Sequence, residues 1–252
     1  MKIVLGIPAR LGSTRFPGKP LCNILGKTMI EHCYKRASFS KYATSLFVAT
    51  CDDEIKTVVE NFGGQVIMTD KNIQRPGLRV AIAAKSLNLQ DNDIVVVIQG
   101  DEPLVTPEMI DLAIQPLLEN DDIYVSNLCK IATITDLNDP GEIKVVCDLK
   151  MNAMYMSRSP IPSMAHEEVR SIWWKQVCIM PFRWHFMKKF NDELSVTPLE
   201  LQESIEMIRA IQHGFKVRMV PSSYNTKSVD TNADRLEVEK IMHSDSLYLK
   251  YK

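Results

Sequence analysis

The sequence lacks several features that would each point to a particular class of protein. Its 252 residues carry a formal net charge of only -1, so there is no basic excess of the kind that nucleic-acid-coating surfaces need. No apolar run approaches the length of a membrane span. The six cysteines are scattered without a CxxC pair, which argues against a zinc site and against a disulfide framework. We therefore expect a cytoplasmic protein of enzyme size, with neither a nucleic acid nor a membrane as its partner.

Two common phosphate-binding fingerprints are also missing. There is no GxGxxG run, and the stretch that ends in Gly18-Lys19 departs from a Walker A loop because Pro20 stands where Ser or Thr is needed. Internal repeats, low-complexity tracts and flexible linkers are absent as well. The sequence therefore matches neither of the two best-known nucleotide-binding loops.

The pattern that is present in the first half is an alternation of short apolar runs and helical segments. Ile3–Ile7 and Leu46–Thr50 are predicted strands, Thr28–Ala37 shows helical spacing, and Asp52 could cap the next helix. The most apolar run is Ile94–Ile98 (IVVVI), and such a continuous β-branched run is typical of the middle of a parallel sheet covered by helices. Repeated βαβ units predict an α/β fold with a doubly wound, mostly parallel sheet.

The second half of the chain has a different pattern. Strands are predicted at Ile143–Cys147, Ala153–Met156 and Lys175–Met180, separated by turn signals. One helix is predicted from Thr197 to His213, and a last one at Ala233–His243. We expect a single domain over residues 1–252, with a mostly antiparallel insertion at about 125–190.

A basic loop follows the first predicted strand directly. The run Pro8–Lys19 lies at that strand's carboxyl end, where open α/β sheets bind ligands. Arg10, Arg15 and Lys19 place three cations close together, and the glycines between them let the backbone approach a ligand. On this chemistry phosphate binding is favoured over the alternative, a solvated basic turn.

Two aspartates could hold a metal ion beside such a loop. Asp101 follows the IVVVI strand in Gln99-Gly100-Asp101-Glu102-Pro103, and Mg²⁺ prefers one or two carboxylates together with phosphate oxygens. Asp230 would be a suitable second ligand if the two converge, although an Asp before a helical pattern more commonly caps the helix. Asp101 could also do no more than end its strand, and spacing does not decide between these roles.

Several segments occur in an order that resembles a known family. They are IPARLGSTRFPGKPL, VIQGDEPLV, IKVVCD followed by AMYMSRSPIP, TPLELQE followed by IRAI, and SVDT. Over nearly the whole chain they are similar to the 3-deoxy-manno-octulosonate cytidylyltransferases (CMP-Kdo synthetases), with a more distant likeness to the spore-coat polysaccharide cytidylyltransferases. The resemblance implies a Rossmann-like nucleotidyltransferase fold, CTP as donor, Mg²⁺ as cofactor, and a homodimer built partly through the insertion.

The resemblance also implies a reaction and a set of site residues. The anomeric hydroxyl of a sugar acid attacks the α-phosphate of CTP and pyrophosphate leaves, for the synthesis of a surface glycan such as lipopolysaccharide or capsule. The implied catalytic residues are Lys19, Asp101 and Asp230, of which Asp101 and Asp230 bind the metal. The implied nucleotide-binding residues are Pro8, Arg10, Ser13, Lys19, Arg75, Gly77, Arg79 and Gln99. The implied sugar-binding residues are Gln99, Arg158, Gln176, Met180, Glu206 and Met207.

Three stretches depart from the family pattern. The family's Ser-Gly-Thr-Asp/Glu-Arg run beside the nucleotide base is replaced here by Arg75-Pro76-Gly77-Leu78-Arg79, which leaves the identity of the base open. A His and a Tyr that touch the sugar are replaced by Gln176 and Met180, and a Gln after the pocket glutamate by Met207. Because lost hydrogen-bonding groups change which substrate a pocket accepts, we expect a sugar acid that is less hydroxylated than Kdo or substituted differently.

Other interpretations stay open at the level of the sequence. The same fold could use another nucleoside triphosphate or a different acceptor sugar. It could also belong to a non-catalytic nucleotide-binding descendant, but the retention of Asp101 and Asp230 argues against this, because a protein that only binds needs no metal pair. The sequence does not distinguish one metal ion from two.

Overall fold

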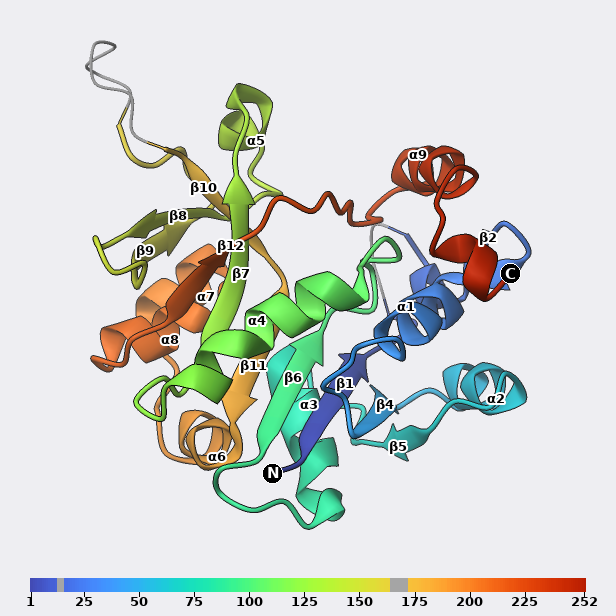
Figure 1. The fold of residues 1–252 in the computed structure, drawn as a ribbon, viewed down its shortest axis with the longest axis horizontal. Coiled ribbons are helices and arrows are strands. Elements are labelled where there is room, and N and C mark those ends of the chain that lie inside the picture. Colours follow the sequence, from blue (N-terminus) through green and yellow to red (C-terminus); the bar gives the residue numbers. More distant parts are fainter. Residues whose placement is uncertain (13–15, 164–171) are drawn as a thin grey trace. The chain divides into compact units, whose positions relative to one another are not determined.

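The computed structural model of the chain describes residues 1–12, 16–163 and 172–252 (Figure 1). Within these residues the chain forms two compact units. The first unit comprises Met1–Asp111 together with Asn225–Lys252, and the second comprises Leu112–Tyr224. The predictions of a single domain and of an insertion used for dimerisation stay predictions.

The first unit is built on parallel strands. The order is β6 (Ile94–Ile98), β1 (Ile3–Pro8), β4 (Ser45–Thr50) and β5 (Val66–Met68), and every neighbouring pair is parallel. All five residues of β6 are buried, as a central strand requires. Because parallel strands end at the same edge of a sheet, the segments that follow β1, β4 and β6 start from one edge. The predicted α/β fold with a mostly parallel sheet is confirmed.

Helices and short elements connect these strands. The helices of the first unit are α1 (Met29–Ala37), α2 (Asp53–Asn61), α3 (Pro76–Ala84) and α9 (Asn232–Met242), and α4 (Pro107–Glu119) divides its residues between the two units. The short elements are η1 (Lys19–Leu21), β2 (Asn23–Ile24), β3 (Lys27–Thr28), η2 (Lys85–Leu87) and η3 (Tyr248–Lys250). Outside the two undescribed stretches, no helix is long and apolar enough to cross a membrane.

The second unit is built on a mostly antiparallel sheet. Its order is β12 (Arg218–Pro221), β7 (Ser126–Ile131), β10 (Trp174–Val177), β8 (Lys144–Cys147) and β9 (Ala153–Ser157). Only the β12–β7 pair is parallel. The remaining elements are β11 (Ile179–Arg183), α5 (Ile134–Asn138), α6 (Trp184–Asp192), α7 (Pro198–Glu203) and α8 (Met207–Gln212).

The prediction of one helix from Thr197 to His213 is wrong, because two helices occupy this stretch. Thr197 caps the first, since its side chain accepts a hydrogen bond from the Glu200 backbone N–H. The helix ends at Ser204, which adopts the left-handed conformation with φ 55° and ψ 47°. A left-handed residue cannot continue a right-handed helix, so α8 starts separately at Met207.

The prediction of one strand at Lys175–Met180 is also wrong. The backbone bends at Cys178, so β10 ends at Val177 and β11 begins at Ile179, outside the sheet that contains β10. The buried side chain of Asn127 donates to the carbonyls of Val177, at 2.7 Å, and Ile179, at 3.3 Å. A side-chain amide thus satisfies backbone acceptors at the break, which the apolar pattern of the run does not reveal.

A buried ion pair joins α7 to α8. Arg209 Nη2 lies 2.6 Å from Glu200 Oε1, and Arg209 Nε lies 2.8 Å from Glu200 Oε2. Arg209 Nη1 also donates to the carbonyl of Phe190, at 3.0 Å. Both charged side chains are almost fully buried. Because the two helices meet through a forked contact between desolvated charges, loss of either partner should leave the other charge unbalanced.

We expect Glu200→Gln to lower the free energy of unfolding by about 3 kcal/mol, because the Arg209 charge stays buried without a counter-charge. Urea denaturation of the purified protein measures this change. The matched control is Glu193→Gln, which removes an exposed ion pair with Lys189 and should cost at most about 0.5 kcal/mol. Equal losses in the two variants would contradict the assignment.

Candidate active site

Two carboxylates converge on one ammonium group in the first unit. Lys19 Nζ lies 2.8 Å from Asp101 Oδ2 and 2.9 Å from Asp230 Oδ1. The Lys19 side chain is 12% exposed, whereas each aspartate keeps about a third of its side chain in solvent. Burial by itself lowers the pKa of Lys19, but the ionic and hydrogen-bond contacts of Asp101 and Asp230 outweigh it and hold the pKa above its ordinary value. The group is therefore a cation throughout the neutral pH range.

Two glycines allow Lys19 and Asp101 to meet. Gly18 has φ +68°, a left-handed conformation that L side chains rarely adopt, and it turns the chain into η1 at Lys19. Gly100 lies against the end of β1, where an added Cβ would be 2.8 Å from the carbonyl oxygen of Pro8. Its missing side chain lets the segment after β6 pass close to the loop that follows β1.

Backbone and capping contacts hold Asp230 beside Asp101. The Val229 backbone N–H donates to the Asp101 carbonyl at 2.9 Å. Thr231 is the N-cap of α9 and forms a capping box with Asp234. The alternative role of Asp230 as the cap of this helix is therefore wrong, and its carboxylate binds Lys19 instead.

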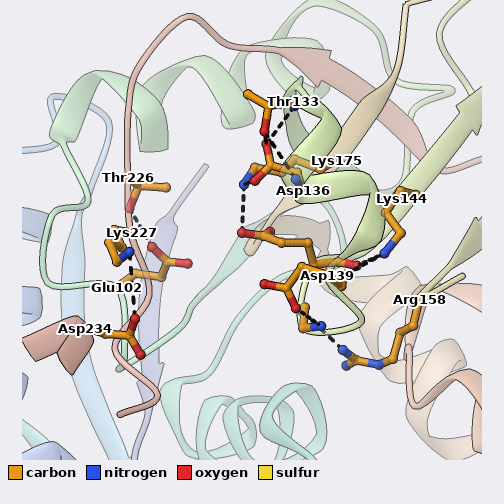
Figure 2. A network of polar contacts seen from close by, with 12 residues as sticks. Glu102, Thr133, Asp136, Asp139, Lys144, Arg158, Lys175, Thr226, Lys227 and Asp234 are labelled. Carbon is orange, nitrogen blue, oxygen red and sulfur yellow. Dashed lines mark hydrogen bonds and ion pairs between the residues drawn. The ribbon is translucent and has the colours of Figure 1, made fainter. Parts of the chain in front are cut away.

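A second link joins the same two segments. The hydroxyl of Thr226 donates to Glu102 Oε2 at 2.5 Å, and Lys227 lies 3.8 Å from Asp234 (Figure 2). Glu102 adjoins one converging aspartate, and Thr226 lies four residues before the other. The Thr226–Glu102 bond therefore joins the two segments independently of the Lys19 ammonium, whereas the Lys227–Asp234 contact lies within one of them.

The start of the basic loop is held by neighbouring segments. Asp52 Oδ2 accepts a hydrogen bond from the Leu11 backbone N–H at 2.8 Å, and the exposed Arg10 donates to the side chain of Gln74. Asp52 occupies the N-cap position of α2, as predicted, but its side chain makes no capping hydrogen bond. The prediction that this side chain caps the helix is therefore wrong. The predicted nucleotide-binding residue Ser13 lies outside the described residues, as does Arg15.

The stretch that departs from the family pattern forms the start of α3. Arg75 is the N-cap residue and is half-buried, and Gly77 is buried in the first turn. Arg79 is 2% exposed, and its guanidinium donates to the Thr69 hydroxyl and the Ile73 carbonyl, both at 2.5 Å. Arg79 thus supports the loop that leads into α3, whereas Arg75 lies at the helix start.

The remaining predicted residues of the first unit lie at strand ends. Pro8 is the last residue of β1 and is buried, and Gln99 follows β6 directly and is half-buried. Both stand at the carboxyl edge of the parallel sheet, where Lys19, Asp101 and Asp230 meet.

In the second unit, Arg158 is held by several backbone and side-chain contacts. Its Nε donates to the Glu203 carbonyl at 2.8 Å, and its Nη1 donates to the carbonyls of Pro140 and Gly141 at 2.9 and 3.2 Å. Figure 2 shows Arg158 directed toward the turn that contains Asp139. The Glu203 carboxylate accepts a further bond from the Arg158 backbone N–H, at 2.9 Å. Arg158 is therefore fixed in place by protein groups.

Two lysines hold the same turn. Lys144, which is fully buried, donates to the carbonyls of Asp139 and Glu142 at 2.8 and 2.7 Å (Figure 2). Lys175 forms ion pairs of 2.7 Å with both Asp136 and Glu142. Residues 139–142 are thus fixed by cations on β8 and β10 as well as by Arg158.

The other predicted sugar-binding residues fall into two groups. Gln176 is buried, and its Nε2 donates to Asn127 Oδ1 and lies 3.8 Å from Met180 Sδ. Glu206 occupies the half-buried N-cap position of α8, and Met207 is the buried first residue of that helix. The structure brings Gln176 and Met180 together as two sides of the bend at Cys178.

Three residues that support the site were not predicted from the sequence. Asp52 fixes Leu11, Glu203 fixes Arg158, and Asn127 fixes Gln176. Only Asp52 carried a signal, because it follows β4 at the edge where β1 and β6 also end. The other two act through tertiary contacts that no local pattern encodes.

The two converging aspartates suit Mg²⁺, which completes its coordination with substrate and water, better than a metal ion that takes all its ligands from the protein. In the described parts of the chain, no group of three or more His, Cys, Asp or Glu could hold a metal ion. Mg²⁺ is commonly bound by one or two carboxylates, and substrate phosphates and water complete its coordination shell. Asp101 and Asp230 provide this number of carboxylates. The assignment of Asp101 and Asp230 as metal ligands stays a prediction.

The chain is similar to characterised protein families over almost its full length. A family profile described as cytidylyltransferase matches residues 4–228. A 3-deoxy-manno-octulosonate cytidylyltransferase of Geobacter metallireducens is 38% identical, with 93% of this chain and 95% of the relative covered. An 8-amino-3,8-dideoxy-manno-octulosonate cytidylyltransferase of Shewanella woodyi is 40% identical, with 93% and 96% covered. The solved structure of a CMP:2-keto-3-deoxy-manno-octonic acid synthetase complexed with CTP superposes with a TM-score of 0.90 at 32% identity, covering 96% of this chain and 99% of the other.

The support of Arg158 by Glu203 predicts a pH effect on stability. Burial raises the pKa of Glu203, but the bonds from the Arg158 backbone N–H and from the hydroxyls of Ser157 and Tyr155 outweigh it, so the pKa lies below its ordinary value. A group whose pKa is lowered by folding stabilises the protein above its unfolded pKa, and this stabilisation is lost as the pH falls through the folded value. We therefore expect the wild type to lose more stability than Glu203→Gln between about pH 5 and pH 3.

Urea denaturation at each pH measures this difference. Tyr155→Phe, which removes one of the three donors to Glu203, should lie between the two curves. Parallel curves for the wild type and Glu203→Gln would show that the carboxylate contributes nothing that depends on its charge.

Proposed function

This chain belongs to the cytidylyltransferase family, and from that premise we propose that it joins CMP from CTP to the anomeric hydroxyl of a 3-deoxy-octulosonate-like sugar acid. Pyrophosphate is the second product. The observation that carries the proposal is the convergence of Lys19, Asp101 and Asp230 at the carboxyl edge of the parallel sheet. The activated sugar would serve the synthesis of a surface glycan such as lipopolysaccharide or capsule.

The relatives support both substrates. Two of them are named for cytidylyl transfer to 3-deoxy-manno-octulosonate or its 8-amino derivative, and the superposed structure is named as a complex with CTP. Identities of 32–40% over nearly the whole chain are high enough for the reaction type to carry over. The departures at residues 75–79 make the choice of base the part of the proposal that most needs a direct test.

We propose Mg²⁺ as the cofactor, held by Asp101 and Asp230. When bound, it would neutralise charge on the phosphate oxygens of CTP and keep them in position. The donor chemistry supports this role, because the two carboxylates leave ligand positions for substrate phosphates.

The cations of the basic loop act on the triphosphate in this proposal. The hydroxyl of the sugar acid attacks the α-phosphorus, the bond to the β-phosphate oxygen breaks, and negative charge develops on the leaving pyrophosphate. Lys19 provides a point charge and Arg10 a forked donor to stabilise that charge, so the protein contributes position and electrostatics and no covalent intermediate.

The second unit supplies the residues proposed to bind the sugar acid. A guanidinium carries five N–H donors, and the Nε and Nη1 groups of Arg158 donate to backbone carbonyls. Its Nη2 group is the part that we propose to meet the sugar's carboxylate. The rigid support by Glu203 and residues 140–141 favours this role, because a fixed donor loses little entropy on binding.

A differently substituted acceptor is a second candidate. Gln176 and Met180 lie together in the second unit where the family has a His and a Tyr, and Met207 replaces a Gln. The 40% identical relative that is named for the 8-amino sugar supports an acceptor in which a hydroxyl is replaced by another group. The two acceptors share the carboxylate and the anomeric hydroxyl on which the reaction depends.

We also propose that the enzyme is a homodimer. Large apolar side chains are exposed at one end of the second unit's sheet: Ile131 by 61%, Ile134 by 54% and Ile172 by 59%. Their backbone positions are close in space, because β7 ends at Ile131 and the Ala132 N–H donates to the carbonyl of Trp173. Such a patch supports a second copy as its partner, in the insertion where the resemblance implies dimerisation.

A cytoplasmic location completes the proposal. All six cysteines are free thiols, which suits a reducing compartment, and CTP is a cytoplasmic metabolite.

Pyrophosphate release from each of the four nucleoside triphosphates, with Kdo as acceptor, tests the reaction. We expect release with CTP and Mg²⁺ only, and a loss of at least about 100-fold in kcat for Asp101→Asn, because removal of one preorganised charge at a transition state costs this much. Turnover with another nucleoside triphosphate would show that cytosine is not the base that the enzyme requires. Binding of CTP without turnover under every condition would favour a non-catalytic descendant.

The acceptor is tested by comparing kcat/KM for Kdo and for its 8-amino derivative with CTP held constant. We expect the 8-amino sugar to be used at least as efficiently as Kdo, because a pocket that lacks the usual hydrogen-bonding groups discriminates less in favour of a hydroxyl. An efficiency with Kdo equal to that of an ordinary family member would contradict this prediction and leave the cytidylyl transfer itself intact.

A further inference from the structure

The position of the Lys19 ammonium carries an inference about how the metal and the nucleotide bind. Its Nζ lies where the two carboxylates converge, 2.8 Å from Asp101 and 2.9 Å from Asp230. A divalent cation shared by these carboxylates would take the same place. The Mg²⁺–oxygen distance is about 2.0–2.1 Å, so each carboxylate would need to approach the ion by less than about 1 Å relative to its distance from Nζ.

We infer that Lys19 and the divalent cation occupy the space between Asp101 and Asp230 alternately, so that the metal binds well only when a nucleoside triphosphate draws the ammonium away. The inference rests on the proposed function, since it takes these carboxylates as the metal pair. It goes further by assigning Lys19 a second role, as a positioning residue that competes with the cofactor.

Steric and electrostatic reasons make the two cations exclusive. The Lys19 side chain is 12% exposed and its ammonium contacts one oxygen of each carboxylate, so a metal ion shared by those two oxygens must displace it. An ammonium also cancels one of the two negative charges that attract the metal, and it repels a second cation at short range. Both effects lower the affinity of the site for a metal on its own.

The nucleotide removes both obstacles. Its phosphate oxygens offer the ammonium a new acceptor, and they offer the metal ligands that two carboxylates alone do not provide. The long, flexible lysine side chain can turn from the carboxylates to a phosphate without a change of backbone. Metal and nucleotide therefore bind cooperatively, and each should increase the affinity for the other by the same factor.

The backbone keeps the carboxylates in place when Lys19 turns away. The Val229 N–H binds the Asp101 carbonyl, and Thr226 binds Glu102, so the two segments do not depend on the lysine for their alignment. A variant without the ammonium should therefore retain a preformed pair of carboxylates with higher affinity for a divalent cation.

Binding of Mn²⁺ alone, with neither nucleotide nor sugar acid, tests the inference. Free Mn²⁺ gives a sharp EPR signal that is lost on binding, so a titration reports affinity without any turnover. We expect Lys19→Met to bind Mn²⁺ at least about tenfold more tightly than the wild type, because a positive charge next to the ligands is gone. Lys19→Arg keeps the charge and should bind like the wild type.

Two further variants locate the effect. Lys2→Met removes an exposed lysine before the amino end of β1, at the edge of the sheet opposite the carboxylates, and should leave the affinity for Mn²⁺ unchanged. Lys19→Met combined with Asp101→Asn should lose the gain of Lys19→Met. Equal or weaker binding by Lys19→Met overturns the inference, and so does a gain that survives the loss of Asp101.

A measurement on the wild type covers the case in which Lys19→Met does not fold. Reductive methylation followed by mass spectrometry should modify Lys19 faster when Mn²⁺ is present, with no change at Lys2 on the opposite edge of the sheet. An unchanged rate at Lys19 under saturating Mn²⁺ overturns the inference. A failure of the proposed function has a different signature, since it would appear as absence of pyrophosphate release whatever the outcome of these titrations.

Discussion

Parallel pairing of β6, β1, β4 and β5 is the constraint on which the candidate site depends. Strands that run in one direction end at one edge, so the segments after β1, β4 and β6 start beside one another. Each of these segments contributes a charged group: Lys19 after β1, Asp52 after β4 and Asp101 after β6. Asp230 reaches the same edge through the backbone hydrogen bond from the Val229 N–H to the Asp101 carbonyl. An antiparallel arrangement would have sent half of these groups to the opposite edge.

The first unit uses small residues and buried contacts to bring these charges within reach of one another. Gly100 permits close passage over the end of β1, and Gly18 permits the turn into η1. The Lys19 ammonium offsets the electrostatic repulsion between the two nearby carboxylates, and the carboxylates in turn stabilise its positive charge. Opposite charges that satisfy one another can still exchange partners when a ligand of higher charge arrives, and this makes such a cluster suited to a substrate that brings phosphates.

The second unit uses cations for a different purpose. Lys144, Arg158 and Arg183 each donate to backbone carbonyls, and Arg183 lies almost fully buried with Leu117 as one acceptor. A buried cation needs several acceptors, and a loop or helix end has carbonyls without partners, so each contact satisfies both groups. The turn at residues 139–142 and the position of Arg158 are consequences of this pairing. Arg158, which we propose binds the sugar acid, thus already uses part of its hydrogen-bonding capacity on backbone carbonyls.

The sequence by itself determined the fold class and the identity of the charged residues at the strand ends. The β-branched run at Ile94–Ile98, the loop from Pro8 to Lys19 and the order of the family-like segments are local signals, because they depend on residues close together in the chain. The breaks at Ser204 and Cys178 were beyond such signals, since apolar periodicity continues across both. Only the tertiary structure decided that Asp230 binds Lys19, although 211 residues separate the two, and that Glu203 fixes Arg158. These outcomes depend on which groups become neighbours when the strands pair, and a pairing between distant segments leaves no pattern in either of them.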